Sequence, residues 1–369
     1  MKKKILVTQS SIPSLEEYMK EIESIFENKW LTNMGEKHQL LEKNLKEYLN
    51  VSNISLYTNG HMALYIAIKS FNFPKGSEVI TTPYSFASTT HAIVQNNLNP
   101  IFCDINNVDY TIDVNKIEEL ITEKTVAIVP VHVYGHVCNV EKIEKIAKKH
   151  NLKVIYDAAH VFGVKYKGES IANYGDISMF SFHATKVFNT IEGGALVYND
   201  SNKRRLLERL KNFGIVDADH VDEVGTNAKM NEFSAAMGIC NLRHIDEEIE
   251  KRKKVYEKYI ERLDGIEGLT VSKIQKDIIP NYAYFPVIFD RELFGKDRNE
   301  VMEKLAKENI FTRKYFYPLI SDYECYRNLY DSTKTPVAKK ISNSVLTLPM
   351  YADLSIEDVN RICDIILKR

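Results

Sequence analysis

Cysteine is scarce in this chain, which has five cysteines among 369 residues. They are scattered, odd in number and never spaced as Cys-x-x-Cys, and they are Cys103, Cys138, Cys240, Cys325 and Cys363. Such spacing does not indicate a disulfide framework or a dithiol redox site. We interpret these residues as small buried hydrophobic side chains of a protein in a reducing cytoplasm.

Long apolar runs are also missing. The basic start at residues 1–4 would suit a signal peptide, but the apolar run at 5–7 is far too short for its core, and residues 9–13 are mostly polar. No later stretch approaches the length needed to span a membrane. We therefore expect a cytoplasmic protein without a membrane partner.

The chain has no excess of either charge. Its 49 basic and 50 acidic residues give a formal net charge of -1. This composition provides neither a field for wrapping nucleic acid nor a polybasic face for an anionic membrane. We expect no nucleic-acid partner.

Repeats, low-complexity blocks and linkers rich in proline or glycine are absent as well. Hydrophobic residues make up 44% of the chain, which supports a well-buried interior. A chain of this length suits a large domain with a smaller companion. Because no flexible linker separates them, the two domains should pack closely on each other.

Apolar segments of strand length alternate with segments of helical periodicity in the first part of the chain. Helices are predicted at 15–26 and 38–49, before the first strand, and at 85–96 and 140–150 between later strands. The predicted strands are 54–57, 78–81, 100–104, 126–131, 153–156, 177–182 and 195–198. This alternation predicts an α/β fold whose mostly parallel sheet is covered on both faces. Ligands of such sheets bind at the carboxyl ends of the strands.

A long helical stretch at 232–263, rich in Lys, Arg and Glu, leads into a second domain. Beyond it, a strand is predicted at 282–289 and helices at 296–309 and 355–367. We therefore predict a large domain at 1–245, which includes the N-terminal helices, and a small α+β domain at 246–369.

Lys186 and Asp157 indicate a site for pyridoxal 5'-phosphate. The cofactor needs an amine that holds it as a Schiff base, an anion beside its pyridine nitrogen, and donors for its phosphate. Lys186 follows the largely apolar segment 177–182 and precedes the pair Gly193 and Gly194, so it lies at the end of a buried strand. A lysine is costly to place there without a purpose. The alternatives are a solvated surface lysine and, for Asp157, a helix N-cap.

Several segments then carry a family resemblance in the same order along nearly the whole chain. They are Trp30–Gly35, Thr58–Gly60, Thr82–Phe86, Pro130–Gly135, Asp157–His160, Ser181–Gly194 and Asn227–Glu232. With them the chain resembles the sugar-aminotransferase family often called DegT/DnrJ/StrS, within the aspartate-aminotransferase-like (type I) fold of pyridoxal phosphate enzymes.

The resemblance implies roles around the cofactor ring. Lys186 would form the Schiff base and, once displaced by substrate, would move a proton between the sugar carbon and the C4' carbon of the cofactor. Asp157 would pair with the pyridinium nitrogen. His160 would donate a hydrogen bond to the 3'-oxygen, although a satisfied core histidine is the alternative. Phe86 would stack on one face of the ring.

The resemblance also implies a phosphate site at a helix N-terminus. Gly60 would supply it with the amides of His61 and Met62, and Ser181 would add its hydroxyl. Many relatives carry serine or threonine where this chain has His61, so a side-chain hydroxyl is lost while the backbone donors remain. Asn227 would come from the other subunit, because the family builds each site across a homodimer interface.

Candidate substrate residues are less specific. Thr32, Arg313 and Tyr317 would line a sugar-nucleotide channel, but the aromatic run that contains Tyr317 is also typical of core packing. His183 would position the substrate or the lysine, or it has a structural role.

Two histidines raise the question of a metal site. His132 and His136 are four residues apart, but the residues between them predict a strand end and turn rather than one helix face. We predict no metal.

The leading hypothesis is an aminotransferase that moves an amino group from L-glutamate to a keto group of a nucleotide-linked 6-deoxy sugar. The Lys186 segment is similar to that of enzymes that aminate C4 of dTDP-4-keto-6-deoxyglucose for surface polysaccharide, such as the O-antigen of lipopolysaccharide. Pocket shape, which sequence does not fix, decides the sugar. One alternative is a sugar 3-dehydratase, whose relatives carry histidine in place of Lys186. The other is a non-catalytic regulator built on the same fold.

Overall fold

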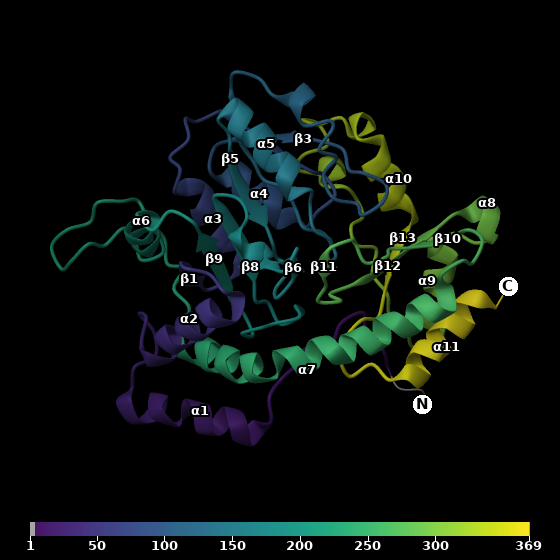
Figure 1. Cartoon of the computed structure of the whole chain (residues 1–369), viewed down its shortest axis with the longest axis horizontal. Helices are drawn as coiled ribbons and strands as arrows, with labels where there is room; N and C mark the ends of the chain where they lie inside the picture. The colour runs from purple at the N-terminus through teal and green to yellow at the C-terminus, as the bar shows by residue number, and fades with distance from the viewer. Residues whose placement is uncertain (1–3, 369) are drawn as a thin grey trace.

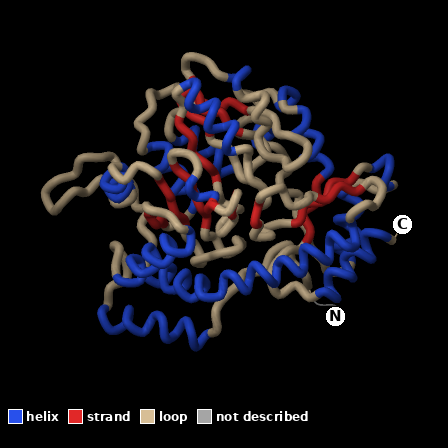
Figure 2. The backbone as a smooth tube through the Cα atoms, viewed as in Figure 1, coloured by secondary structure: helices blue, strands red, loops and turns tan. Residues whose placement is uncertain are grey.

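A seven-stranded sheet forms the centre of the larger domain in the computed structural model, which describes residues 4–368. In spatial order its strands are β1 (Ile54–Tyr57), β9 (Gly194–Tyr198), β8 (Ile177–Ser181), β5 (Lys153–Asp157), β4 (Thr125–Ile128), β2 (Glu78–Thr81) and β3 (Asn99–Phe102). Strand β9 runs antiparallel to both of its neighbours, and the other pairings are parallel. The predicted α/β fold is therefore confirmed (Figures 1 and 2).

Alternate residues of these strands enter two different cores, which explains why the strands are nearly all apolar. Val154 and Tyr156 of β5 belong to one buried cluster, whereas Ile155 between them belongs to another. Side chains alternate across a strand, so helices must cover both faces of the sheet. One face is covered by α3 (Gly60–Lys69), α4 (Ala87–Gln95) and α6 (Lys203–Leu210), and the other by α2 (Glu36–Leu49), α5 (Val140–His150) and the first half of α7 (Glu232–Leu263).

The helix α7 joins the two domains. Ile239 and Ile245 in its first half pack in a core of the large domain, and Val255, Tyr259 and Leu263 pack in a separate core. The 32-residue helix is therefore shared by both cores, and Figure 1 shows it running across the lower part of the molecule, above α1. Helix α1 (Leu15–Asn28) packs on its N-terminal part.

The second domain is built on a small antiparallel sheet. Its strands are β10 (Leu269–Val271), β12 (Phe285–Phe289) and β13 (Val345–Leu348), and its helices are α8 (Arg291–Phe294), α9 (Arg298–Lys307) and α11 (Ile356–Leu367). Ile5, which the predicted boundary assigns to the first domain, pairs with Ile310 and packs in this second core. Ala338 and Ile341 of α10 (Pro336–Ser344) pack instead with the large domain. The boundary at residue 245 itself stays a prediction.

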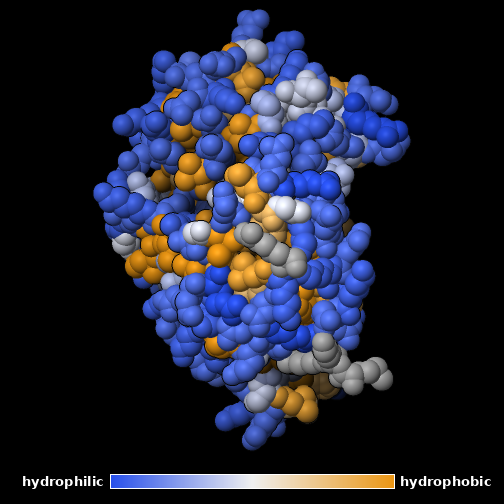
Figure 3. Space-filling model, turned by 90° about the vertical axis from the view of Figure 1, so that its right-hand side faces the viewer, coloured by the Kyte–Doolittle hydropathy of each residue, from blue (hydrophilic) through white to orange (hydrophobic). Residues whose placement is uncertain are grey.

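Short elements complete the chain. They are the strands β6 (Lys165–Tyr166), β7 (Glu169–Ser170) and β11 (Ile278–Ile279), which form a third sheet, and the 3-10 helices η1 (Glu118–Leu120), η2 (Ile171–Asn173), η3 (Ile320–Asp322) and η4 (Ser332–Lys334). Within residues 4–368, no helix has both the length and the apolar character to cross a bilayer. Figure 3 shows one face of the molecule, where separate apolar patches interrupt a mostly hydrophilic surface.

His132 makes the stability of the fold depend on pH. Its ring is fully buried, stacks on Tyr156 at 4.6 Å, and accepts a hydrogen bond from the backbone N–H of Cys138. Burial lowers the pKa of His132 from 6.5 to about 3, because a charged imidazole would lose its hydration. Below pH 6.5 the His132 imidazole therefore binds a proton in the unfolded chain but not in the folded chain. The free energy of unfolding consequently falls as pH decreases from 6.5 towards 3.

We expect His132→Asn to weaken this dependence, because its amide oxygen still accepts from Cys138 but does not titrate. We expect the free energy of unfolding of the wild type to fall relative to that of His132→Asn by about 2 kcal/mol between pH 6.5 and pH 5, as measured by urea unfolding. Every other titrating group contributes equally to both proteins and cancels in the difference. A difference in the free energy of unfolding that stays constant with pH would contradict this prediction.

Candidate active site

The carboxyl edge of the large sheet brings together most of the residues predicted to bind the cofactor. Asp157 ends β5 and Ser181 ends the neighbouring strand β8, with Asp157 paired to Met179. Gly60 follows β1 and lies against Ser181, since a Cβ atom on Gly60 would be 2.8 Å from the Cβ of Ser181. Parallel strands that end at one edge therefore place these groups side by side.

The carboxyl of Asp157 is buried at this edge, with 5% of the residue exposed. Its Oδ2 accepts a hydrogen bond from Thr89 Oγ1 at 2.8 Å, and its Oδ1 accepts one from Ala159 N at 3.2 Å. Burial raises the pKa of Asp157, and the two hydrogen bonds and the charge of Lys186 oppose that rise. An ionised carboxylate in this place is costly unless a cation meets it.

His160 follows Asp157 by three residues and is also buried. Its Nδ1 accepts a hydrogen bond from Tyr134 N at 3.0 Å, so the proton of the neutral ring is on Nε2. Burial, reinforced by the charge of Lys186, lowers the pKa of His160 well below its usual value. The ring is therefore a neutral donor, as the predicted contact to the cofactor's 3'-oxygen requires. It lies against the rings of Tyr284 and Phe316.

Lys186 sits in the loop between β8 and β9 and is half-buried. Its backbone N–H donates to His183 O at 2.9 Å. Its Nζ donates to the hydroxyl of Tyr284 at 3.3 Å. Tyr284 comes from the segment just before β12, and the sequence pattern placed it in a strand without indicating a role. No local pattern relates Tyr284 to Lys186, which precedes it by 98 residues.

The turn after β1 leaves backbone donors at a helix N-terminus. Asn59 caps α3, and its Oδ1 accepts from Met62 N at 2.8 Å. The Met62 amide, which we expected to face the phosphate, is therefore occupied by the cap. The amides of Gly60 and His61 begin the helix without intrahelical acceptors and remain suited to an anion.

Gly194 lets β9 approach this turn. A Cβ atom on Gly194 would lie 2.7 Å from the carbonyl carbon of Asn59 and 2.8 Å from the Cα of Gly60. A side chain does not fit at such distances, so the close contact of β9 with the turn at Asn59 and Gly60 requires glycine at position 194.

The His61 side chain is already engaged elsewhere. Its Nδ1 pairs with Ser88 Oγ at 2.9 Å and its Nε2 with Gln95 Oε1 at 3.0 Å, both on α4. Only the backbone of His61 is therefore suited to the predicted phosphate contact. Phe86, the N-cap residue of α4, is 62% exposed. A ring this exposed has a free face on which a planar ligand could stack.

Asn227 lies near the end of an excursion of the chain that spans 211–228, and no hydrogen bond among residues 4–368 joins it to another predicted cofactor residue. The excursion is closed at its base, where Ala228 N donates to Lys211 O at 2.9 Å and Thr58 N donates to Ala228 O at 2.8 Å. The loop after α6 extends from the body of the molecule at the left of Figure 1. The Asn227 amide is exposed and accepts a hydrogen bond from Lys229 Nζ at 2.7 Å.

The predicted substrate residues Thr32, Arg313 and Tyr317 lie at the surface. Thr32 and Arg313 are exposed, Tyr317 is 49% exposed, and no hydrogen bond among residues 4–368 joins any of them to Lys186 or Asp157.

The predicted substrate side chains contact other residues near them in the chain or in space. The guanidinium of Arg313 lies 5.6 Å from the ring centroid of Tyr315, and that of Arg298 lies 4.3 Å from the ring of Tyr317. The imidazole of His183 is held within its own loop by Thr185, with Glu192 3.6 Å away.

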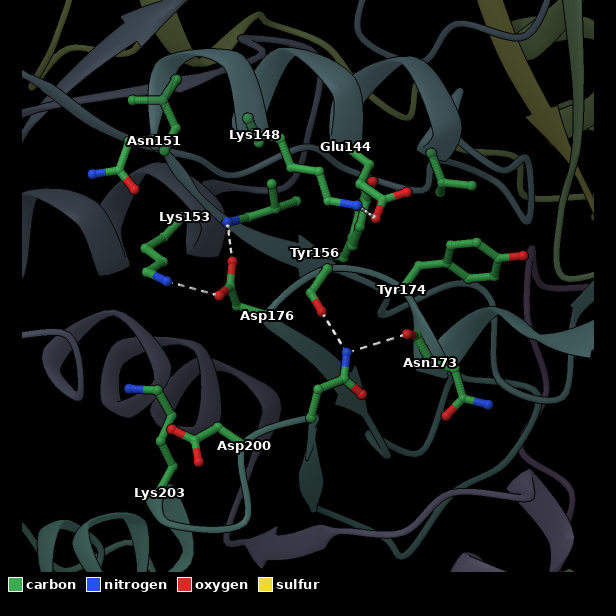
Figure 4. Close-up of a pocket in the computed structure, with 16 residues that line it drawn as sticks. Glu144, Lys148, Asn151, Lys153, Tyr156, Asn173, Tyr174, Asp176, Asp200 and Lys203 are labelled. Atoms are coloured by element: carbon green, nitrogen blue, oxygen red, sulfur yellow. Dashed lines mark hydrogen bonds and ion pairs between the residues drawn. The ribbon is translucent and has the colours of Figure 1, made fainter.

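A cleft of about 700 Å³ lies at the opposite edge of the sheet, where β5 and β8 begin. Figure 4 shows its polar side chains, among which Lys148 pairs with Glu144 and Lys153 with Asp176. Lys153 contacts Asp176 at 3.2 Å, and Asn199 donates to Gly175 O at 2.8 Å. The charged side chains of this cleft are half-buried or exposed, unlike the buried Asp157 carboxyl at the carboxyl edge.

These groups fit pyridoxal phosphate. The buried Asp157 carboxyl requires a cation such as a protonated pyridine, the Lys186 amine is within electrostatic reach of it, and the amides of Gly60 and His61 suit a phosphate. A Cβ atom on Gly60 would clash with Ser181, so the turn after β1 lies directly against the end of β8, where Ser181 is placed.

Comparison with known proteins gives a consistent result. The sequence matches the DegT/DnrJ/EryC1/StrS aminotransferase family over residues 14–367. It is 44% identical over 355 residues to the dTDP-4-amino-4,6-dideoxy-D-glucose transaminase of Shigella dysenteriae, with 96% of each chain covered. It is 45% identical over 370 residues to the Escherichia coli protein of the same name, with 99% of this chain and 98% of the relative covered.

A solved structure supports the same relationship. The structure described as DesI in the presence of its TDP-sugar product has a TM-score of 0.94 at 29% identity, over 100% of this chain and 94% of that chain.

Replacing Asp157 by asparagine should separate stability from cofactor binding. The amide keeps the shape of the carboxyl and its contact with Thr89, whose hydroxyl also bonds Ser85 and can exchange roles. Above the raised pKa of Asp157, the variant avoids a buried charge, so the cofactor-free protein should unfold at a higher temperature than the wild type.

Pyridoxal phosphate should nonetheless bind roughly 10-fold to 100-fold more weakly to Asp157→Asn, because a charge-assisted hydrogen bond is lost. Thermal unfolding of the cofactor-free proteins and a fluorescence titration with the cofactor measure the two effects. Equal cofactor affinity in the two proteins would show that Asp157 does not meet the cofactor.

Proposed function

The chain belongs to the DegT/DnrJ/EryC1/StrS aminotransferase family, and from this premise we propose that it transfers an amino group from L-glutamate to C4 of dTDP-4-keto-6-deoxyglucose. As a member of this family it is an enzyme, and its cofactor is pyridoxal phosphate. The observation that carries the proposal is the carboxyl edge of the large sheet, where the buried Asp157 carboxyl, Ser181 and the Gly60 turn lie together and the Lys186 loop follows β8. A buried carboxyl whose pKa is raised, at the edge of a sheet where ligands bind, is typical of a functional site.

The described residues divide the work of binding. Lys186 would hold the cofactor through its amine, Asp157 would face the ring nitrogen, and His160 would donate from Nε2 to the ring oxygen. Phe86 would cover one ring face, and Gly60, His61 and Ser181 would bind the phosphate. When bound, the cofactor supplies an electron sink that lets a C–H bond next to an amino nitrogen ionise.

Proton transfer is the task of Lys186. After the substrate amine displaces it, its Nζ accepts the proton from one carbon and returns it to another, so the same side chain acts first as base and then as acid. His160 stays neutral because of its burial and therefore does not compete for that proton.

The dTDP sugar is proposed from the similarity to two transaminases of that specificity. Relatives named GDP-perosamine synthase are less similar, such as that of Escherichia coli O157:H7 at 33% identity. The exposed Arg313 beside Tyr315 and the half-buried Lys314 beside Tyr317 suit a nucleotide diphosphate. We further propose that the product enters a surface polysaccharide such as O-antigen.

The two alternatives receive less support. A 3-dehydratase of this family would carry histidine where Lys186 stands, and a non-catalytic regulator would need neither the amine nor the buried carboxyl. We place the enzyme in the cytoplasm, where nucleotide sugars are made.

We also propose a homodimer. Apolar side chains are exposed on the 211–228 excursion and on α1, which is unusual for a surface that stays in water. They are Phe213, Ile215, Val216, Val221 and Val224 on the excursion and Leu15, Met19 and Phe26 on α1. A second copy of the chain would cover them and would receive Asn227 at its phosphate site.

The reaction is tested with the visible absorbance of the purified protein loaded with pyridoxal phosphate. We expect L-glutamate alone to remove the absorbance band of the lysine-bound cofactor, and dTDP-4-keto-6-deoxyglucose to restore it while an amino sugar nucleotide appears by mass spectrometry. Lys186→Ala should never show the band, whereas Lys153→Ala, at the opposite edge of the sheet, should behave like the wild type. A band that ignores glutamate would refute the donor, and a band restored only by another keto sugar would refute the substrate.

The shared site is tested by subunit complementation. Lys186→Ala and Asn227→Ala should each be inactive as homodimers, so that co-expression yields mixed dimers with one doubly defective and one intact site. Roughly a quarter of all sites would then be intact if both chains are equally abundant. Without restored activity in the isolated mixed dimer, Asn227 would belong to the site of its own chain.

A further inference from the structure

Tyr284 lies against the Lys186 amine, and none of the proposed cofactor or substrate contacts uses it. Its hydroxyl is 3.3 Å from Nζ, and Nζ lies 5.8 Å from the centroid of its ring. We propose that Tyr284 is a further catalytic residue, whose phenol oxygen holds the ammonium form of Lys186 while Nζ carries the substrate proton. This inference rests on the proposed function, because it assigns the proton carrier to Lys186.

The protonated amine needs an acceptor near at hand. An ammonium group has three N–H donors and no acceptor, and it is costly to leave unpaired in a half-buried place. Asp157 and His160 also face Lys186 electrostatically. The Asp157 oxygens already accept from Thr89 and Ala159, and His160 Nδ1 accepts from Tyr134. Among residues 4–368, the hydroxyl of Tyr284 is the oxygen within hydrogen-bond distance of Nζ.

A phenol suits this task better than a carboxylate does. Its oxygen accepts a hydrogen bond from an ammonium, and its O–H donates one to a neutral amine. The group can therefore stay bonded to Lys186 through both protonation states. A carboxylate in the same place would hold the proton in an ion pair and would oppose its return to carbon.

The surrounding side chains fix the phenol in place. The ring of Tyr284 is 4.6 Å from that of His160, 6.2 Å from Tyr134 and 6.0 Å from Tyr315. Only 9% of Tyr284 is exposed, so its hydroxyl has little freedom to leave Lys186.

The contact is tested first without cofactor or turnover. Cofactor-free protein is reductively methylated across a range of pH, and the fraction of Lys186 modified is measured by mass spectrometry. Tyr284→Phe removes the acceptor for the ammonium form, so the pH of half-maximal modification should fall by about 1 unit relative to the wild type. An unchanged midpoint would overturn the proposal, because a ring that only packs would not move it.

Tyr282→Phe is the matched control. It removes a hydroxyl from the same segment, but its ring contacts Tyr256 at 5.3 Å. This variant should leave the midpoint for Lys186 where it is in the wild type. An equal shift in both variants would mean that the segment moved and would overturn the assignment to the Tyr284 hydroxyl.

The role in turnover is tested with the loaded enzyme. Tyr284→Phe should keep the absorbance band of the bound cofactor while kcat falls roughly 10-fold to 100-fold with KM for glutamate nearly unchanged. The kinetic isotope effect with α-deuterated glutamate should increase, because proton transfer becomes slower. A normal kcat would overturn the catalytic role. If the wild type shows no band at all, the proposed function fails, and the methylation experiment still tests the contact.

Discussion

The burial of the Asp157 carboxyl is the constraint on which the site depends. A carboxyl at the end of a buried strand loses its hydration, and its raised pKa reflects that cost. The two hydrogen bonds from Thr89 and Ala159 orient it without supplying a positive charge. A bound cation resolves this imbalance, and the parallel sheet places the Lys186 loop beside it through the neighbouring strand β8. The fold thus creates an electrostatic requirement that the proposed ligand would meet.

Much of the fold could be predicted from the sequence, because the large domain is built from local patterns. The helix at 232–263 and the strand at 54–57 have the predicted bounds, since their apolar periodicity is uninterrupted. The strands β10 and β13 of the second domain were not predicted. They are three and four residues long and gain their pairing from β12 and not from their own pattern. Ile5 joined the second core for the same reason, through a long-range contact with Ile310.

The part of the site that could be predicted from the sequence consists of residues placed there by the ends of strands. Gly60, Asp157 and Ser181 follow or end strands, and the topology brings those ends to one edge. The hydrogen-bond partners of the side chains could not be predicted. The ring of His61 is engaged by α4, and the Met62 amide is taken by the Asn59 cap. These contacts depend on the packing of one helix against another, which periodicity does not encode.

Tyr284 ties the site to both domains. Its segment leads into β12 of the second domain, yet its ring packs in the core of the first, beside His160 and Tyr134. The environment of the Lys186 amine therefore depends on how the two domains pack. A substitution in that interface that moved the phenol would therefore alter proton transfer without touching the cofactor.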